Sequence, residues 1–237
     1  MKMKRGCFFL ILLFVIVANV MKVNAIQTGF KINELPSEEK NMFISNINLS
    51  LVEEEPVKKA IVCFDVNSNQ LIAIGQDTIG IRKTICVYSN EGAFQYGYTF
   101  DCSGSFGVEW DKEKLNIYFV RSDVVVSVTP KGEVLEALEV PYTIENNTYV
   151  NHLLYSDKRI VGDEVFLIRN NMGLLNLFAA SWSQIIVKDS VGVESIIYDV
   201  SSMQNSKMIV SISLICIFVL VAAAAVIRQI VKLRRGK

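Results

Sequence analysis

The sequence lacks most of the residue patterns on which catalytic and metal sites are built. His152 is the only histidine, and no serine lies in a GxSxG turn, so a nucleophilic triad is not expected. The chain has no CxxC pair, which leaves a zinc site unsupported, and no glycine-rich phosphate loop. We therefore expect no catalytic residues, no metal and no cofactor, and we expect His152 to lie half-buried in a strand.

The body of the chain also has few cysteines from which disulfide bonds could form. Between its two apolar ends the chain holds three cysteines, Cys63, Cys86 and Cys102, and an odd number cannot form a complete disulfide framework. All three lie among apolar residues, where a free cysteine behaves as a small hydrophobic side chain. We interpret them in that way rather than as a disulfide scaffold.

Acidic residues are missing from both ends of the chain. Residues 1–25 and 207–237 together carry ten basic residues and no Asp or Glu. The segment between them, 26–206, therefore keeps 14 basic residues against all 24 acidic residues, a balance of −10. Such an acidic body argues against binding to nucleic acid, whose phosphates need basic patches. The distribution is typical of a membrane-tethered protein whose body lies on the far side of the membrane.

The N-terminal segment has the organisation of a secretory signal. Three basic residues precede an apolar run over residues 7–20, which is too short to span comfortably because a spanning helix needs about 20 residues. Val23 and Ala25 suit the −3 and −1 positions of a cleavage site. We predict a signal peptide over residues 1–25. The alternative is an uncleaved signal anchor, which the basic Lys22 after the run favours.

A second apolar segment predicts one membrane-spanning helix. Residues 208–227 contain no charged side chain. At about 1.5 Å per residue, a helix of this length crosses the hydrocarbon core. We predict a transmembrane helix over residues 207–228 and a basic tail over 229–237, which the positive-inside rule places in the cytoplasm. The chain is then a single-pass protein of the cell membrane, type I, with its body outside the cytoplasm.

The body itself divides into two parts. Residues 26–56 are polar with scattered apolar positions, and they are interpreted as a lead-in that supplies a further strand or remains a flexible stalk. Over residues 57–206, short runs of β-forming residues alternate with turn residues, about every 8 to 12 positions. This pattern predicts a mainly β, antiparallel, extracytoplasmic domain.

The β-rich part is repetitive. Gly92, Gly132 and Gly192 stand at the eighth position of three similar stretches, and Ser68 holds that place in a fourth. A strand, a tight turn with positive φ and a returning strand make a hairpin. The stretches are IVCFDVNSNQLIAI from Ile61, ICVYSNEGAFQYGY from Ile85, VVSVTPKGEVLEAL from Val125 and IIVKDSVGVESIIY from Ile185.

The two later hairpins each follow a similar strand-rich stretch. Arg121-Ser122-Asp123 corresponds to Arg169-Asn170-Asn171, so each later unit looks like a four-strand antiparallel meander of roughly 40 residues. Over residues 57–200 this pattern resembles the blades of a β-propeller of the NHL and related kind. We count two full units and two bare hairpins, whereas a closed propeller has about four to eight blades. A very small ring, an open stack of meanders and a half completed by a partner all remain open.

The later of these two units contains an insertion, MGLLNLFAASWS, over residues 172–183. Leu174, Leu177 and Phe178 have the spacing of one side of a short helix. We favour a helix that plugs the end of the β core, and the alternative is an apolar patch for a partner or for the outer membrane surface. The candidate contact residues are Leu174, Leu175, Leu177, Phe178 and Trp182.

Two further patterns in the sequence are candidates for a binding or catalytic site. Residues 65–69, DVNSN, begin like a calcium loop, but Gln70 and Gln76 stand where a glycine and a bidentate glutamate belong, so a hairpin turn is expected. A glycosidase needs two carboxylates facing each other across a sugar. The candidates for such a pair are Glu109, Asp111, Glu113, Asp163 and Glu164.

These observations favour a membrane-anchored extracytoplasmic binding or interaction module that is not an enzyme. Its expected partners are the lipid bilayer and another envelope or membrane protein. Two alternatives remain: a cell-surface hydrolase that uses acidic residues, and an accessory subunit of a membrane complex.

Overall fold

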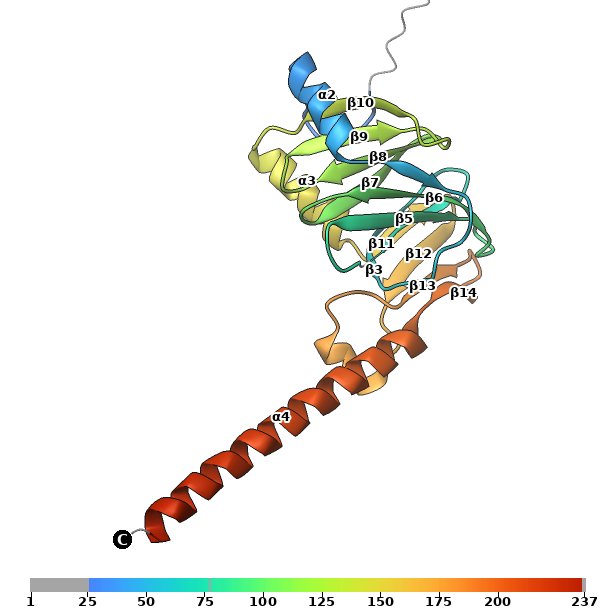
Figure 1. Cartoon of the computed structure of the whole chain (residues 1–237). Helices are drawn as coiled ribbons and strands as arrows, with labels where there is room; N and C mark the ends of the chain where they lie inside the picture. Colours follow the sequence, from blue (N-terminus) through green and yellow to red (C-terminus); the bar gives the residue numbers. More distant parts are fainter. Residues whose placement is uncertain (1–25, 77, 236–237) are drawn as a thin grey trace, which may run out of the picture.

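The fold is described for residues 26–76 and 78–235 of a computed structural model, with the backbone alone for 229–235. The expected signal peptide, 1–25, lies outside the described residues. Three antiparallel sheets form the body, and one long helix leaves it (Figure 1). The predicted mainly β body with an apolar C-terminal helix is therefore confirmed.

Each sheet is a four-strand meander, and two of the sheets gain a short edge strand. Sheet B contains β3 (Ile61–Val66), β4 (Ile72–Gln76), β5 (Arg82–Tyr88) and β6 (Phe94–Asp101), with β2 (Ser50–Val52) beside β6. Sheet A contains β7 (Phe106–Asp111), β8 (Lys114–Phe119), β9 (Val124–Val128) and β10 (Val134–Glu139), with β1 (Asn33–Glu34) beside β10. Sheet C contains β11 (Lys158–Val161), β12 (Glu164–Arg169), β13 (Gln184–Lys188) and β14 (Glu194–Asp199).

The count of two full units and two bare hairpins is wrong. The hairpins at Ile61 and Ile85 are the two halves of sheet B, because β4 pairs with β5 from Ile72 opposite Tyr88 to Gln76 opposite Thr84. The chain thus has three meanders, and within the described residues they form three separate open sheets rather than a closed ring. The sequence repeat did not reveal this because the β4–β5 connection does not match the repeated hairpin sequence, although Gly80 has a φ of 88° there.

The hairpin turns follow the sequence closely. Gly92, Gly132 and Gly192 have φ of 81°, 81° and 89°, as the repeat predicts. In the β3–β4 turn the positive φ of 61° falls on Gln70 rather than at Ser68. Asn67 Oδ1 accepts hydrogen bonds from the backbone N–H groups of Asn69 and Leu71, both at 2.9 Å, so the turn reading of residues 65–69 is confirmed.

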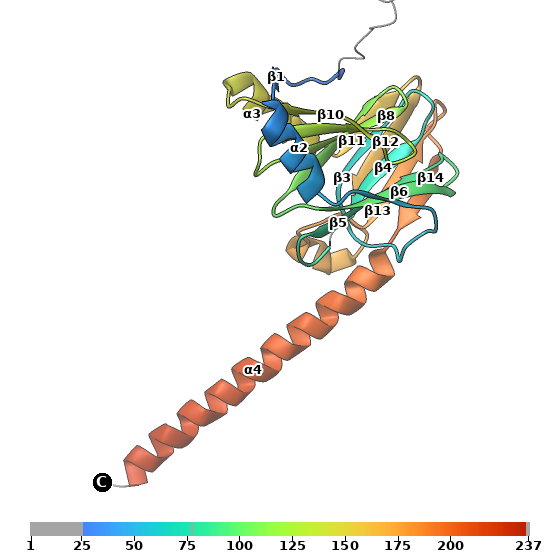
Figure 2. The same ribbon diagram turned by 45° about the horizontal axis from the view of Figure 1, so that its top comes forward.

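The sheets stack as layers with sheet B in the middle (Figure 2). One core joins sheets A and B and includes Cys63, Tyr98, Phe100 and Phe106. A second core joins sheets B and C and includes Phe64, Cys86, Phe166 and Tyr198. The three cysteines of the body are all buried and free, and burial raises the pKa of the Cys63 and Cys86 thiols to about 12.

The first strands of the three sheets meet at one buried ion pair. Asp65 of β3 accepts hydrogen bonds from Arg159 Nε of β11 at 2.8 Å and from the Trp110 N–H of β7 at 2.8 Å. Arg159 also donates to the Phe64 carbonyl oxygen at 3.1 Å. Burial raises the pKa of the Asp65 carboxyl, against the lowering effects of the Trp110 N–H and the Arg159 guanidinium. This cluster, Asp65, Trp110 and Arg159, is called the three-sheet junction below.

The lead-in segment is part of the folded body. It supplies β1, β2 and the helix α2 (Ser37–Asn46), after which Ile47 is 3 % exposed in the core between sheets A and B. Two alternatives were open for residues 26–56. The structure contains additional strands there and not a flexible stalk. Pro36 stands immediately before α2, where its lack of a free N–H costs nothing because the first N–H groups of a helix have no partner.

The outer face of sheet A is closed by the chain itself. The helix α3 (Ile144–Tyr155), which the sequence analysis missed, packs there together with residues 26–32. Thr143 caps α3 by accepting a hydrogen bond from the Asn146 N–H at 3.1 Å. Gly107 allows α3 to approach, since a Cβ at this position would lie 2.7 Å from Leu153 Cδ2. His152 lies exposed on α3, so its expected place in a strand is wrong.

The outer face of sheet C has no such cover among the described residues. Strand alternation places Val165 and Leu167 of β12 on this face, with Ile160 of β11 and Ile196 of β14. Ile160 and Ile196 are 63 % and 57 % exposed. The exposed pair Arg169–Glu194 joins β12 to β14 at 3.1 Å.

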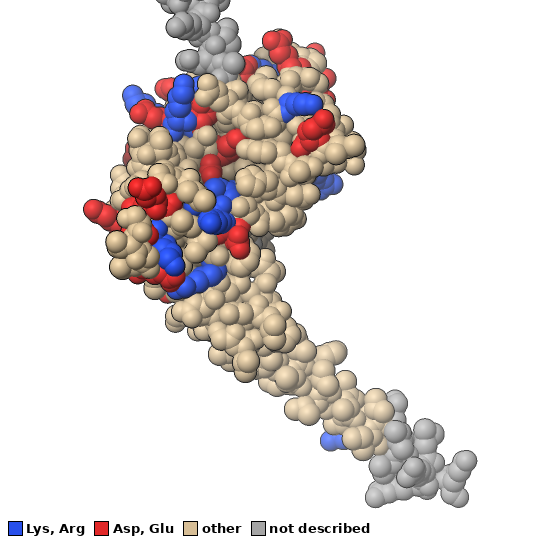
Figure 3. Space-filling view, turned by 180° about the vertical axis from the view of Figure 1, so that it is seen from behind, with Lys and Arg blue, Asp and Glu red and all other residues tan. Residues whose placement is uncertain are grey.

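The long helix α4 (Ser201–Arg235) follows sheet C after a single residue. Burial tends to raise the pKa of Asp199, but hydrogen bonds from Ser201 and Gln184 hold it below its usual value. The helix begins before the expected boundary at residue 207 and continues through the predicted tail to Arg235. Its Ser201–Arg228 part is long and apolar enough to cross a membrane. Figure 3 shows charges of both signs on the body and a long uncharged surface on the helix.

Candidate functional site

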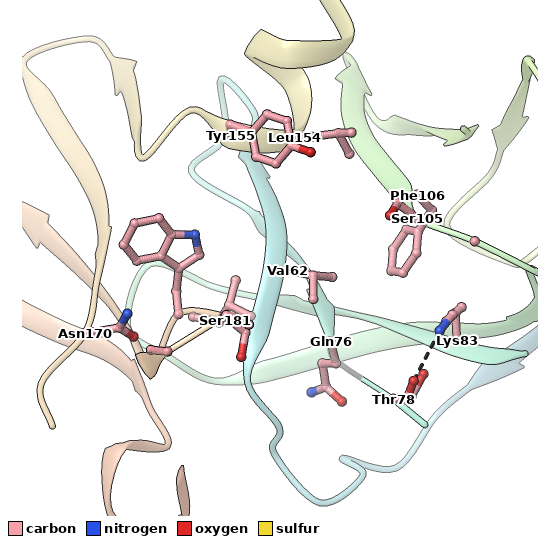
Figure 4. Close-up of a pocket in the computed structure, with 15 residues that line it drawn as sticks. Val62, Gln76, Thr78, Lys83, Ser105, Phe106, Leu154, Tyr155, Asn170 and Ser181 are labelled. Carbon is pink, nitrogen blue, oxygen red and sulfur yellow. Dashed lines mark hydrogen bonds between the residues drawn. The ribbon is translucent and has the colours of Figure 1, made fainter. Parts of the chain in front are cut away.

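A cavity of about 360 Å³ lies where parts of all three sheets come together. Ile61, Val62 and Gln76 of sheet B line it, and residues 104–106 lead from there into sheet A (Figure 4). The C-terminal end of α3, Asn170 after β12 and residues 179–182 of the insertion complete the wall. The cavity is therefore built from segments far apart in the sequence.

Among the described residues, two buried amide oxygens of this wall have no hydrogen-bond partner. They are Gln76 Oε1 and Asn170 Oδ1. Gln76 is 1 % exposed, and its Nε2 donates to the Tyr198 hydroxyl at 3.2 Å. This hydrogen bond fixes the orientation of the amide, while its Oε1 has no donor among the described residues. A buried acceptor without a partner costs roughly 1–3 kcal/mol. Such an atom marks a place where a ligand donor would be favourable.

Lys83 supplies positive charge to the cavity. Its Nζ donates to the Thr78 carbonyl oxygen at 3.1 Å, and the side chain is half-buried. The described lining residues include hydroxyl groups on Thr78, Ser105 and Ser181 but no carboxylate, imidazole or thiol, while residue 77 lies outside the described residues. The arrangement can hold an anionic group beside Lys83, whereas the two amide oxygens are shielded from solvent and meet a ligand donor only when a neighbouring side chain moves.

The insertion contributes to the cavity through its second half alone. Its first half is the short 3-10 helix η1 (Gly173–Phe178), so the predicted helical turn is confirmed. Leu174, Leu177 and Phe178 are 87 %, 85 % and 70 % exposed, so the favoured plug is wrong for these three side chains. Leu175 is half-buried. The physical reason is that Trp182 is held against β3, Ser183 against Arg169 of β12 and Ser181 against Gln204 of α4, which leaves η1 outside these contacts.

Trp182 is the one candidate contact residue that lines the cavity. Its backbone makes an isolated antiparallel bridge with Ile61, with N···O distances of 2.8 and 2.9 Å. The bridge connects the insertion to the first strand of sheet B. Trp182 is thus placed apart from the exposed group Leu174, Leu177 and Phe178.

Two of the five acidic residues proposed for hydrolysis, Glu109 and Asp111, bind the N-terminal segment of the body. Glu109 accepts hydrogen bonds from Thr28 Oγ1 at 2.6 Å, from the Gly29 N–H at 3.0 Å and from the Tyr149 hydroxyl. Asp111 accepts from the Gln27 N–H at 3.0 Å. Glu113 and Asp163 are exposed, and Glu164 is half-buried. Among the described residues no cluster of His, Cys, Asp and Glu has the arrangement of a metal site.

The residues that give the cavity its polarity were missed from the sequence. Gln76 carried a usable signal, because it is the only polar side chain in the otherwise apolar strand β4. Asn170 and Lys83 carried none, since polar residues are common next to strand ends.

Comparison of the chain with protein-family models, with curated proteins and with solved structures gives no match. The geometry of the chain is therefore the basis for a function.

Proposed function

We propose that this chain is a single-pass membrane protein whose body binds a ligand in the cavity where the three sheets meet. The observation that carries the proposal is the pair of unpartnered buried oxygens, Gln76 Oε1 and Asn170 Oδ1, in the wall of one cavity that also contains an ammonium group. A cavity of this size lies within the range of about 300–1,000 Å³ that is usual for small-molecule sites. The ligand that fits carries an anionic group and N–H or O–H donors, such as a short peptide end or a sugar acid.

Membrane anchorage is supported by the uncharged stretch of α4 and by the charge distribution of the sequence. The basic residues after the helix favour a cytoplasmic C-terminus, which leaves the acidic body outside. The resemblance of the three meanders to propeller blades stays a proposal, and it is supported by β3, which contacts both β7 and β11 as the first strand of a middle blade in an open stack would.

Binding is favoured over hydrolysis by the chemistry of the described wall. General acid–base hydrolysis of glycans needs a pair of carboxylates at the substrate. Glu109 and Asp111 are engaged with residues 27–29, and they do not line the cavity.

The proposal is tested by thermal unfolding of the full chain in lipid nanodiscs with amino acids, di- and tripeptides, and sugar acids. A ligand at about 100 times its dissociation constant stabilises by about 2.7 kcal/mol. This corresponds to a rise in Tm of roughly 5–10 °C for a chain of this size. Trp182 in the wall provides a fluorescence signal for direct titration.

Two cavity variants and one matched control make this test specific. We expect Lys83→Met to abolish the response to anionic compounds and Asn170→Ala to weaken it, while Lys131→Met on the exposed β9–β10 turn leaves it unchanged. The Asn170 side chain makes no hydrogen bond through its oxygen, so its removal spares the fold. A compound that stabilises Lys83→Met as well as the parent, or a library without any stabilising compound, contradicts the proposal.

A second candidate, an accessory subunit of a membrane complex, is favoured by the outer face of sheet C. This face carries the exposed side chains Ile160 and Ile196 and lies beside the start of α4. If a membrane partner covers it, Ile196→Glu should abolish co-purification, whereas Leu135→Glu on sheet A should not. Equal co-purification of both variants with the same partner would argue against this candidate.

A further inference from the structure

The helix η1 presents three apolar side chains to solvent at one place. Leu174, Leu177 and Phe178 are 87 %, 85 % and 70 % exposed, although each belongs to the residue types most often buried. They are three of the six residues in one short turn of helix. A cluster of this kind marks a contact surface, since scattered single apolar residues are normal but grouped ones are not.

The turn itself is well defined. Asn176 Oδ1 accepts a hydrogen bond from the Met172 N–H at 2.8 Å, and Gly173 takes a φ of 59°, which glycine adopts without strain. Met172, at its start, is 5 % exposed and anchors the turn in the body. The apolar side chains are therefore held outward by an ordered backbone.

Hydrogen bonds fix the insertion to the first turn of α4. Gln204 Nε2 donates to Ser181 Oγ at 3.0 Å, Ser201 Oγ lies 3.0 Å from Ser183 Oγ, and the Val200 N–H donates to the Ser183 carbonyl oxygen at 2.9 Å. Figure 1 shows η1 beside the start of α4, on the side of the body from which the helix leaves. The position of η1 along the helix is thus set by the fold.

That position coincides with the start of the uncharged stretch. Phe178 lines a shallow hollow together with Met203, Lys207 and Met208. Lys207 is the last charged residue before the stretch 208–227. Met208 is the fourth residue after Gln204, which places it about 6 Å further along the helix axis. Phe178 is therefore level with the point at which α4 would enter the hydrocarbon region.

We propose that η1 is a second membrane contact, which inserts Leu174, Leu177 and Phe178 among the lipids of the leaflet that α4 enters first. Leucine and phenylalanine suit the boundary between headgroups and acyl chains, and Lys207 can meet a lipid phosphate at the same level. The inference rests on the proposed membrane anchorage by α4. It adds that the body is held at a fixed tilt, with the cavity close to the membrane because residues 179–182 line it.

Lipid is favoured over a protein as the occupant because the surface is continuous with the bare surface of α4. Val210 and Leu214, in the turns that follow, are 59 % and 62 % exposed and have the same apolar character. A protein partner or a second copy would have to displace lipid from both surfaces together. These occupants become distinguishable outcomes of the experiment.

The experiment places an extra tryptophan in the full chain and quenches it with lipid. The chain is reconstituted in nanodiscs of phosphatidylcholine that carries no bromine, bromine atoms near the headgroup end of the acyl chains, or bromine atoms near the middle of the bilayer, where Phe218 is expected. The test variant is Phe178→Trp. Tyr142→Trp, at an 86 % exposed position next to sheet A, is the matched control away from α4, and Phe218→Trp within α4 is the positive control. Signals are taken as differences from the parent, which retains Trp110 and Trp182.

We expect brominated lipid to quench the added signal of Phe178→Trp at least twofold and to leave that of Tyr142→Trp unchanged. Quenching of Phe218→Trp without quenching of Phe178→Trp overturns the inference while leaving the membrane anchor intact. A Phe178→Trp signal that is blue-shifted but unquenched overturns it in favour of a protein occupant. Lack of quenching in Phe218→Trp contradicts the proposed anchorage itself, and the inference falls with it.

Discussion

The two ends of the sheet stack are finished differently. At the sheet A end, residues 26–32 and α3 cover the outer face, and the covering residues Ile26, Phe30 and Leu153 are 4–6 % exposed. At the sheet C end, Ile160 and Ile196 remain more than half exposed, and the chain continues directly into α4. The comparison indicates that the sheet A end is completed by the chain itself, whereas the sheet C end is arranged for contacts outside it.

The largest expected loss of stability comes from breaking the three-sheet junction, which connects sheet A and sheet C to sheet B. Asp65→Ala removes the carboxylate of the three-sheet junction and leaves Arg159 buried, with 11 % of its side chain exposed. Removing one partner of a buried pair costs about 3–5 kcal/mol. Denaturant unfolding of the body, followed by tryptophan fluorescence, measures the change.

The control for this variant is Glu194→Gln, which breaks the exposed pair Arg169–Glu194 on sheet C. It should lower the free energy of unfolding by less than about 1 kcal/mol. Similar losses from the two substitutions would mean that Asp65 does not connect the sheets.

A second pair of substitutions compares the two outer faces directly. Phe30→Ala at the sheet A end should cost about 3–5 kcal/mol, because the ring is buried between Tyr118 and Tyr149, at centroid distances of 4.7 and 4.8 Å. Ile196→Ala at the sheet C end should change the free energy of unfolding by about 0.5 kcal/mol or less in detergent, since its side chain is exposed. Equal costs would show that the two faces are equally complete.

A smaller effect is expected where α3 approaches sheet A. Gly107→Ala places a Cβ 2.7 Å from Leu153 Cδ2, and such overpacking typically costs about 1–3 kcal/mol. The same substitution at Gly162, where a Cβ meets nothing within 4 Å, tests the strain of its positive φ alone. Thermal unfolding of both variants separates crowding at the closed end from local backbone strain.

The smallest expected effect is the pH dependence of stability, which should be absent below pH 9. The interface between sheets A and B and the interface between sheets B and C should both lose stability at higher pH. Burial raises the pKa of Cys63, between sheets A and B, and of Cys86, between sheets B and C, to about 12. The folded chain holds these protons more tightly than the unfolded chain, so stability is fully present below pH 9 and is lost as the pH rises towards 12. Burial also raises the pKa of Tyr98 and Tyr198, in the same direction.

Urea unfolding at several pH values between 8 and 11 checks this sign. The urea concentration at the midpoint of unfolding should decrease as the pH is raised above 9. Peptide mapping after iodoacetamide treatment at pH 8 should find Cys63 and Cys86 unmodified in the folded chain. A midpoint that stays level or rises with pH would be inconsistent with buried neutral thiols.

Local features of the fold could be predicted from the sequence. The glycines of three hairpin turns, the apolar stretch of α4 and the helical spacing in 172–183 each depend on a few neighbouring residues. The stacking order could not be predicted, because Asp65 and Arg159 are 94 residues apart and no pattern links them. Helix α3 was missed because its sequence has weak helical periodicity and its helical form depends on the Thr143 cap and on packing at Gly107.

The cavity was not predicted from the sequence, and the contact role of the five candidate residues stays a prediction. Trp182 does line the cavity, but the exposed residues of η1 were expected to plug the core, since spacing alone does not say which way a short helix faces. Gln76, Lys83 and Asn170 meet only after three sheets have packed together. Their convergence is a property of tertiary structure and leaves no local pattern.

Hydrogen–deuterium exchange of the full chain in detergent tests the difference between the two ends most directly. Amides of β8 and β9, beneath the covered face of sheet A, should remain protected when those of β11 and β14 in sheet C have exchanged. Reconstitution into nanodiscs should then slow exchange in η1 and at the start of α4. Faster exchange in sheet A than in sheet C would contradict the account, because the covered end would then be the less complete one.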